Sequence, residues 1–315
     1  MIRHLSLFLA GALLTAVLFL SLAGKREEHS MVINHPNGTL TIPKLPSDLN
    51  FAGEPAKMDD TDVKERLDRE LLVNTFWHSN TILMLKRANK YFPVIEPILE
   101  KNGVPDDFKY LCMIESGLAN VVSPSNAAGF WQFLSSTGKT YGLEINSEVD
   151  ERFHLTKATE AACAYLKSNK ERLGSWTLAA AAYNMGENGV ERQLQSQGVS
   201  SYYDLHLNTE TARYLFRILA AKEIYSHPEA YGFQLEDEAL YTPIPTRSVE
   251  VDSAVANWPE FALEQGTNYK YLKVLNPWIA SRSLKNKDRK KYTVLLPKNA
   301  QAQERQIEVD PGSDE

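Results

Sequence analysis

Apolar side chains recur at steps of three and four residues from Asp62 to about Ser226. This period places them on one face of an α-helix, where they pack into a core. The pattern predicts successive helices whose buried faces contain Leu67, Leu71, Leu72 and Phe76, and then Met84, Leu85 and Ala88. A further short helix is expected over Phe92–Leu99, ended by Asn102-Gly103. The fold class is therefore mainly α.

The character of the chain changes beyond Tyr231. Prolines become frequent, and two short runs, Ser248–Val251 and Tyr292–Leu296, are typical of β-strands. We therefore expect a small C-terminal α+β appendage over residues 236–298. The remaining polar segment, residues 299–315, is predicted to be a disordered tail.

The N-terminus contains an uncharged apolar run, Leu5–Ala23, preceded by Arg3. Residues 1–24 are predicted to be a secretory signal peptide or an uncleaved N-terminal membrane anchor through residues 5–23, and both readings stay open. Either way the rest of the chain is exported. Residues 25–61 are polar and rich in proline, and are predicted to form a tether without a core.

Charge and cysteine content exclude several classes of protein. The 34 Lys and Arg residues against 40 Asp and Glu give a net charge of −6, which argues against nucleic acid as a partner. Two cysteines exclude a disulfide framework. Cys112 and Cys163 each occupy a buried helical position and are predicted to be small core residues, although a disulfide between them stays open. The histidines are scattered and no HExxH motif occurs, so neither a metal nor a cofactor is expected.

A glutamate lies on the apolar face of the helix predicted over Pro105–Ser116. Phe108, Leu111 and Cys112 occupy offsets 0, 3 and 4 of this face, and Glu115 occupies offset 7. Burial raises the pKa of a carboxyl because it disfavours the charged form. A raised pKa suits a general acid near neutral pH. From this helix alone, a buried salt bridge or a position at the helix edge is the favoured explanation of Glu115.

The loop that follows Glu115 contains no second carboxylate. Neither Asp nor Glu occurs from Ser116 to Tyr141, whereas a hydrolytic glycosidase generally uses two carboxylates. The more distant Asp150 and Glu187 remain candidates to fold inward.

Two later predicted helices, one after Ser175 and one after Thr209, each contain a tyrosine that could take part in a site. Ser175 is predicted to cap a helix that ends just before Gly186. This helix places Tyr183 and Asn184 at its end, where both could hydrogen-bond a ligand. The alternative is that Tyr183 is a core aromatic residue and Asn184 a C-terminal cap. Thr209 is predicted to cap the next helix. On that helix Tyr214 lies off the apolar stripe, either to border a cleft or as a partly exposed structural residue, and the second is favoured for the residue taken alone.

The short motifs fall in a recognisable order. They are Glu115-Ser116, Gly129-Phe130-Trp131-Gln132, Ala182-Tyr183-Asn184 and a late tyrosine, Tyr214. Together they resemble the lytic transglycosylases of the soluble-lytic-transglycosylase (goose-lysozyme-like) superfamily, over roughly residues 62–275. The resemblance implies a lysozyme-like (goose-type, SLT) helical domain over residues 62–235. Phe130 stands where that family usually has Leu or Ile, and Leu134-Ser135 replaces the usual Met-Pro. No clear lysin-motif repeat is recognised, so carbohydrate-binding modules are expected to be missing or degenerate.

The resemblance also implies an activity and a location. The expected substrate is the β-1,4 bond between N-acetylmuramic acid and N-acetylglucosamine in peptidoglycan glycan strands, with a 1,6-anhydromuramic product. The expected location is the periplasm or the membrane of a bacterial cell envelope. A hydrolytic muramidase or chitinase of the same fold, and a non-catalytic cell-wall-binding protein, are the alternatives.

The same resemblance assigns roles to the site residues. Glu115 is the single general acid and base, and Tyr183 orients its carboxyl. Tyr214 and Trp131 line the cleft. Contacts with the sugar are assigned to Ser116, Ser123, Gln132 and Asn184.

Overall fold

The computed structural model describes residues 31–35 and 38–298, which divide into two units at Pro46. In the first unit, β1 (Met31–His35) pairs antiparallel with β2 (Gly38–Ile42). Within the described ranges, no helix is long and apolar enough to cross a membrane. The predicted signal or anchor over residues 1–24 and the predicted tail over residues 299–315 lie outside the described residues.

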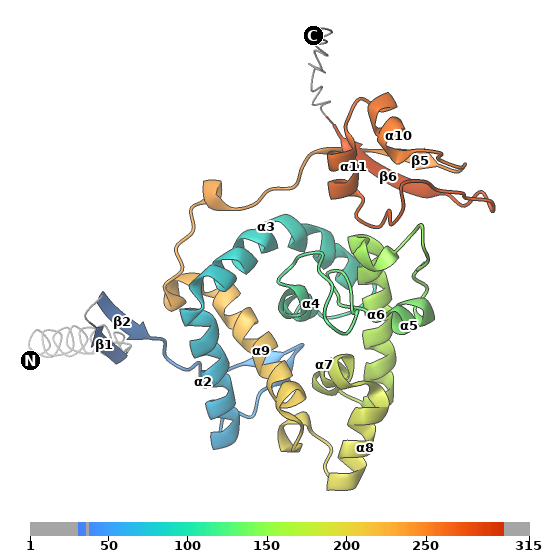
Figure 1. Ribbon diagram of the computed structural model, residues 1–315. Helices are drawn as coiled ribbons and strands as arrows, with labels where there is room; N and C mark the ends of the chain where they lie inside the picture. The colour runs from blue at the N-terminus through green and yellow to red at the C-terminus, as the bar shows by residue number, and fades with distance from the viewer. Residues whose placement is uncertain (1–30, 36–37, 299–315) are drawn as a thin grey trace, which may run out of the picture. The chain divides into compact units, whose positions relative to one another are not determined.

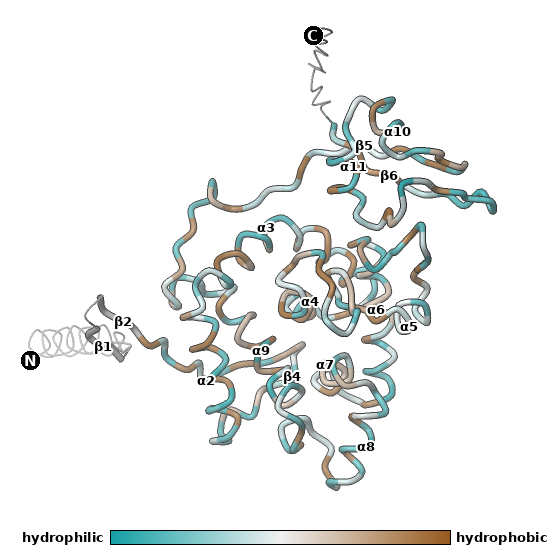
Figure 2. Tube along the Cα trace, viewed as in Figure 1, coloured by the Kyte–Doolittle hydropathy of each residue, from teal (hydrophilic) through white to brown (hydrophobic). Residues whose placement is uncertain are grey.

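The second unit is dominated by helices arranged around a short central helix, α4 (Figure 1). The helices are α2 (Thr61–Phe76), α3 (His78–Lys101), α4 (Phe108–Ser116), α5 (Ser135–Thr140), α6 (Leu155–Leu173), α7 (Trp176–Met185), α8 (Glu187–Gln197) and α9 (Thr209–Ser226). Every residue of α4 from Phe108 to Met113 is buried, as expected of a helix enclosed on all sides. Figure 2 shows that α4 and α7 are mostly apolar, whereas the outer helix α8 is mostly hydrophilic. The mainly α prediction is confirmed.

Helix α3 is one long helix, so the prediction of a separate short helix over Phe92–Leu99 is wrong. Pro93 and Pro97 lie inside it. A proline has no N–H to donate to the carbonyl four residues earlier. The loss of this hydrogen bond can bend a helix without ending it. Figure 1 shows α3 curving over α4, so the bend lets one helix cover two sides of the central one.

Residues 47–61 are part of the second unit, and for them the tether prediction is wrong. The strands β3 (Asn50–Phe51) and β4 (Glu54–Pro55) form a tight hairpin. Phe51 is completely buried, with its ring centroid 5.0 Å from that of Phe108. The carboxylate of Glu54 accepts hydrogen bonds from the backbone N–H groups of Trp176 and Thr177, at 2.6 and 2.9 Å. An acidic side chain is favoured there because the first N–H groups of a helix lack intrahelical partners.

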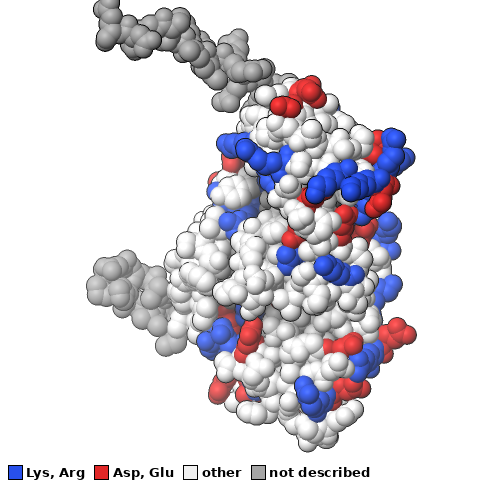
Figure 3. All heavy atoms as spheres, turned by 45° about the vertical axis from the view of Figure 1, so that its right-hand side comes forward, with Lys and Arg blue, Asp and Glu red and all other residues white. Residues whose placement is uncertain are grey.

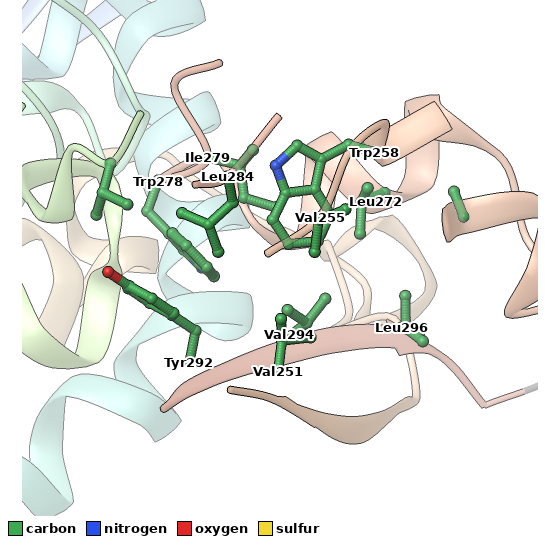
Figure 4. Close-up of a cluster of buried hydrophobic side chains, with 12 residues drawn as sticks. Val251, Val255, Trp258, Leu272, Trp278, Ile279, Leu284, Tyr292, Val294 and Leu296 are labelled. Carbon is green, nitrogen blue, oxygen red and sulfur yellow. The ribbon is translucent and has the colours of Figure 1, made fainter. Parts of the chain in front are cut away.

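The C-terminal module is a two-stranded sheet with two helices. β5 (Thr246–Val251) pairs antiparallel with β6 (Tyr292–Pro297), and α10 (Trp258–Glu264) and α11 (Tyr269–Leu275) lie between them in sequence. Both predicted strands are confirmed. Figure 4 shows its apolar cluster, in which Trp258 and Leu272 are completely buried. Val149 of the helical domain belongs to the same cluster.

The module is joined to the helical domain by backbone pairing. Val149 and Ile279 form an antiparallel bridge. The Asp150 N–H donates to the Trp278 carbonyl and the Ala280 N–H donates to the Glu148 carbonyl, both at 2.9 Å. On the face shown in Figure 3, cationic and anionic side chains are interspersed over both parts.

The loop between α4 and α5 is fixed by Arg152. Its guanidinium binds both oxygens of Asp150, at 3.0 and 2.7 Å, and donates to the carbonyls of Asn126 and Phe133. Gly129 of the same loop adopts φ +81°, and a Cβ there would lie 1.9 Å from the Arg152 carbonyl oxygen. Only glycine allows this approach.

We therefore expect Gly129→Ala to reduce the free energy of unfolding by about 3 kcal/mol or more, because the backbone must move as well as bear a positive φ. The control is Gly142→Ala, where φ is +86° but no atom lies within 4 Å of the new Cβ. The Gly142→Ala substitution should lower the free energy of unfolding by only about 1–2 kcal/mol. Urea unfolding of both variants gives the comparison, and equal losses would show that the close approach carries no cost.

Candidate active site

Glu115 lies near the end of α4, which is buried from Phe108 to Met113. Phe108, Leu111 and Cys112 are completely buried, and Glu115 continues their stripe near the C-terminus of α4. The helix ends at Gly117, which adopts φ 60° and donates its N–H to the Met113 carbonyl at 2.8 Å. The left-handed glycine turns the chain away and leaves the carboxyl partly buried at the edge of the core.

Helix α9 supplies the groups that face this carboxyl. The Tyr214 hydroxyl donates a hydrogen bond to Glu115 Oε1. Burial raises the pKa of Glu115 to about 6, while the Tyr214 hydrogen bond and the positive charge of Arg217 lower it and the charge of Glu210 raises it. Desolvation is the largest of these effects, as the position on the apolar stripe predicts.

Neither tyrosine has the role that was expected of it. Tyr214 is only 1% exposed, so the expectation that it lies off the buried stripe and borders a cleft is wrong. It is also the tyrosine that orients Glu115. The Tyr183 hydroxyl instead donates to the Trp131 carbonyl at 2.7 Å, so the hydrogen bond expected from Tyr183 to Glu115 is not formed. The side chain of Tyr183 therefore holds the loop after α4.

Trp131 is completely buried, so the expectation that it lines the cleft is wrong. Its indole N–H donates to Thr159 Oγ1 at 2.9 Å. An aromatic ring with one polar group is held in a core when that group finds a partner. Trp131 thus anchors the loop to α6.

The expected sugar-binding residues are partly exposed polar groups around this loop. Gln132 Nε2 donates to the carbonyls of Val121 and Gly129, at 3.0 and 2.7 Å. This leaves its Oε1 as an acceptor without a partner among the described residues. The Ser123 hydroxyl accepts from the Ala127 N–H at 3.1 Å and retains its own proton for donation.

Ser116 follows Glu115 directly, and Asn184 is hydrogen-bonded to the first turn of α9. The Ser116 hydroxyl donates to the Cys112 carbonyl at 3.4 Å, within α4. Asn184 accepts from Thr211 Oγ1 at 2.8 Å and donates to Glu210 at 3.4 Å. Helix α9 begins after Asn208, whose side chain accepts from the Thr211 N–H at 3.1 Å, so the prediction that Thr209 is the cap is wrong by one residue.

The distant carboxylates considered from the sequence are engaged elsewhere. Asp150 binds Arg152, as described above, and Glu187 binds Arg172 at 2.6 Å. The carboxylate that acts on Glu115 is instead Glu210, which was not predicted from the sequence. The available signal was spacing, because Glu210 lies one helical turn before Tyr214 on the same face of α9.

Both cysteines are buried and free, so the disulfide left open by the sequence is not formed. Cys112 Sγ lies 3.6 Å from the Phe130 carbonyl oxygen and Cys163 Sγ lies 4.0 Å from that of Ile98. Burial raises the pKa of the Cys163 thiol to about 12. The prediction of two small core residues is confirmed.

The raised pKa makes Glu115 a source of pH-dependent instability. Its pKa is about 6 in the folded chain, against an ordinary value of 4.5 for a glutamate carboxyl. The folded state therefore binds more protons between these values, and stability falls as the pH rises through them. At about 1.4 kcal/mol per pKa unit, the loss is about 2 kcal/mol.

Glu115→Gln does not titrate, so the stability of this variant relative to wild type should increase by up to about 2 kcal/mol between pH 4 and pH 7.5. Urea unfolding at the two pH values measures this change. A constant difference between the two proteins would contradict the raised pKa.

Comparison with known proteins identifies two domains in the chain. Residues 93–205 match the transglycosylase SLT domain. Residues 247–300 match the soluble lytic transglycosylase C-terminal LysM-like domain. This match contradicts the expectation that such a module is missing, because the βααβ module has too short a sequence pattern to be recognised as a lysin motif.

Two curated proteins are similar to the chain. They are the membrane-bound lytic murein transglycosylases D of Escherichia coli strain K12 and strain CFT073, each 31% identical over 194 residues. The match covers 59% of this chain and 42% of each relative, so the chain spans less than half of their length. The chain therefore contains an SLT domain around Glu115 and a LysM-like module after it.

Proposed function

We propose that the protein is a lytic murein transglycosylase that cleaves the β-1,4 bond between N-acetylmuramic acid and N-acetylglucosamine. The observation that carries the proposal is one carboxyl, Glu115, with a pKa of about 6 and a tyrosine hydrogen bond. The match to the SLT domain and the relatives named lytic murein transglycosylase D support it.

The first step of the proposed reaction is proton transfer to the leaving group. Protonated Glu115 donates its proton to the glycosidic oxygen as general acid. The Tyr214 hydroxyl holds Glu115 Oε1, which leaves the other carboxyl oxygen for the substrate. Tyr214 and Arg217 also stabilise the carboxylate that remains.

The second step uses the same carboxylate as a base. It removes the proton from the C6 hydroxyl of the muramic residue, and that oxygen attacks C1 to close a 1,6-anhydro ring. An internal nucleophile has a high effective concentration. The step needs no second carboxylate, which agrees with Asp150 and Glu187 being bound to arginines.

The substrate contacts follow from the polar groups around the carboxyl. Gln132 Oε1 is an acceptor for a hydroxyl or an acetamido N–H, and Ser123 and Asn184 supply further hydrogen bonds. Peptidoglycan glycan strands are the proposed partner, with export to the cell envelope directed by residues 1–24 as a cleaved signal peptide or as a membrane anchor.

The mass of the released muropeptides tests the proposal. Wild-type protein should release products one water lighter than hydrolysed ends. Glu115→Gln should reduce the rate by about 10²-fold or more, the usual contribution of a general acid or base. Glu187→Gln is the control because Glu187, the first residue of the outer helix α8, forms an ion pair with Arg172 of α6. The rate of this variant should stay near that of wild type. Full activity of Glu115→Gln would contradict the proposal.

A hydrolytic muramidase is the second candidate, and Glu210 is the observation that favours it. This exposed carboxylate is close enough to raise the pKa of Glu115 and is linked to Asn184. Two carboxylates on either side of a sugar are what a hydrolase requires.

Glu210→Gln distinguishes the two functions. If the protein is a transglycosylase, this variant keeps the anhydro product. The alkaline limb of its pH profile moves to lower pH, because a negative charge that raises the pKa of Glu115 is gone. A reducing-end product from wild type that disappears in Glu210→Gln would establish the hydrolase instead.

A further inference from the structure

A cavity of about 260 Å³ lies where the helical domain meets the C-terminal module. Its walls come from α3, from the loop after α4, from residues 153–156 at the start of α6, and from β5, α11 and β6 of the module. These walls are largely apolar. The apolar residues include Tyr91, Val94, Phe130, Ile244, Val274 and Trp278. Val94 and Val274 are 38% and 52% exposed, so large apolar side chains remain accessible to a ligand.

Lys90 is the only lysine, arginine or carboxylate side chain that lines this cavity in the described part of the chain. Its Nζ lies 5.1 Å from the ring centroid of Tyr91. No carboxylate of the described residues is within ion-pair distance of it. His154 also lines the cavity, but burial and then the charge of Lys157 lower its pKa, so its ring is neutral at neutral pH. The cavity therefore combines an apolar wall with one unpaired cation.

The cavity is close to the catalytic carboxyl along two paths. Asn120, which lines it, follows Glu115 by five residues, so the two Cα atoms are at most about 18 Å apart. On α3, Arg87 donates to the Gly117 carbonyl at 2.9 Å. Lys90 lies on the same side of α3, about 4.5 Å further along its axis. An extended peptide of about five residues covers this separation.

We propose that this cavity binds the peptide attached to the muramic residue of the glycan strand. Aliphatic side chains of the peptide pack against Tyr91, Val94 and Val274, and a free carboxylate of the peptide pairs with Lys90. The assignment rests on the proposed function and adds a requirement to it: the enzyme recognises strands that carry peptides.

The chemistry of the wall favours a peptide over other parts of the polymer. A sugar ring needs many hydrogen bonds, whereas the polar residues here are few, and Asn120 Nδ2 already donates to the Phe153 carbonyl at 3.4 Å. A plain hydrocarbon would not use the unpaired charge of Lys90. A short aliphatic peptide with a free carboxylate uses both features.

The test compares two substrates: glycan strands with intact peptides, and the same strands after removal of the peptides by an amidase. Lys90→Glu should reduce kcat/KM on peptide-bearing strands about tenfold and change it less than twofold on bare strands. Val274→Glu, at a half-exposed position on α11, should give a similar selective loss.

Lys86→Glu is the matched control. Lys86 lies one turn earlier on α3, outside the cavity, with its Nζ 4.9 Å from the ring centroid of Tyr241. The Lys86→Glu substitution makes the same change in net charge as Lys90→Glu. The activity of the Lys86→Glu variant on both substrates should equal that of wild type. Equal losses of Lys90→Glu on both substrates, no loss on either, or the same loss in Lys86→Glu would overturn the proposal.

A binding measurement keeps this test separate from the proposed reaction. Co-sedimentation of Glu115→Gln and of Glu115→Gln/Lys90→Glu with the two kinds of strand reports affinity without cleavage. Weaker binding of the double variant to peptide-bearing strands alone supports the cavity assignment. Unchanged binding refutes it. Absence of anhydro product from wild type on both substrates contradicts the proposed reaction, and the binding measurement then decides the cavity assignment by itself.

Discussion

The desolvation of one carboxyl at the end of α4 is the constraint on which the site depends. Helix α4 is enclosed by its neighbours, and its residues from Phe108 to Met113 are therefore buried. Its apolar stripe continues into Glu115. The cost of burying that carboxyl is limited by groups that only α9 provides, the hydroxyl of Tyr214 and the charge of Arg217. The packing of α9 against α4 therefore determines the acidity of the group proposed to move the proton.

The loop after α4 depends on a second set of contacts, centred on Arg152. This residue ties the loop carbonyls to Asp150, and the backbone of Asp150 is in turn hydrogen-bonded to Trp278 of the C-terminal module. The module thus shares one framework with the loop that surrounds Glu115. The proposed peptide cavity lies at this junction, where both parts contribute walls.

Local patterns were sufficient wherever short-range periodicity carries the information. The position of Glu115 on a buried face and both strands of the module were predictable because each depends on residues within two helical turns or one strand. The predictions that failed depend on distant partners. Glu54 was placed in a tether because its partners, the N–H groups of Trp176 and Thr177, lie more than a hundred residues away. Helix α3 continues through Pro93 and Pro97 because it bends over the core, which a local pattern does not contain.

The sequence by itself determined a mainly helical chain with one glutamate on an apolar face and no second carboxylate in the following loop. The order of its motifs indicated the superfamily. Tertiary structure decided which tyrosine bonds to Glu115, that Trp131 is an anchor instead of a cleft wall, and that Glu210 is the nearby carboxylate. The reason is physical: periodicity fixes the face of a helix that a residue occupies, whereas the partner across that face depends on how separate helices pack.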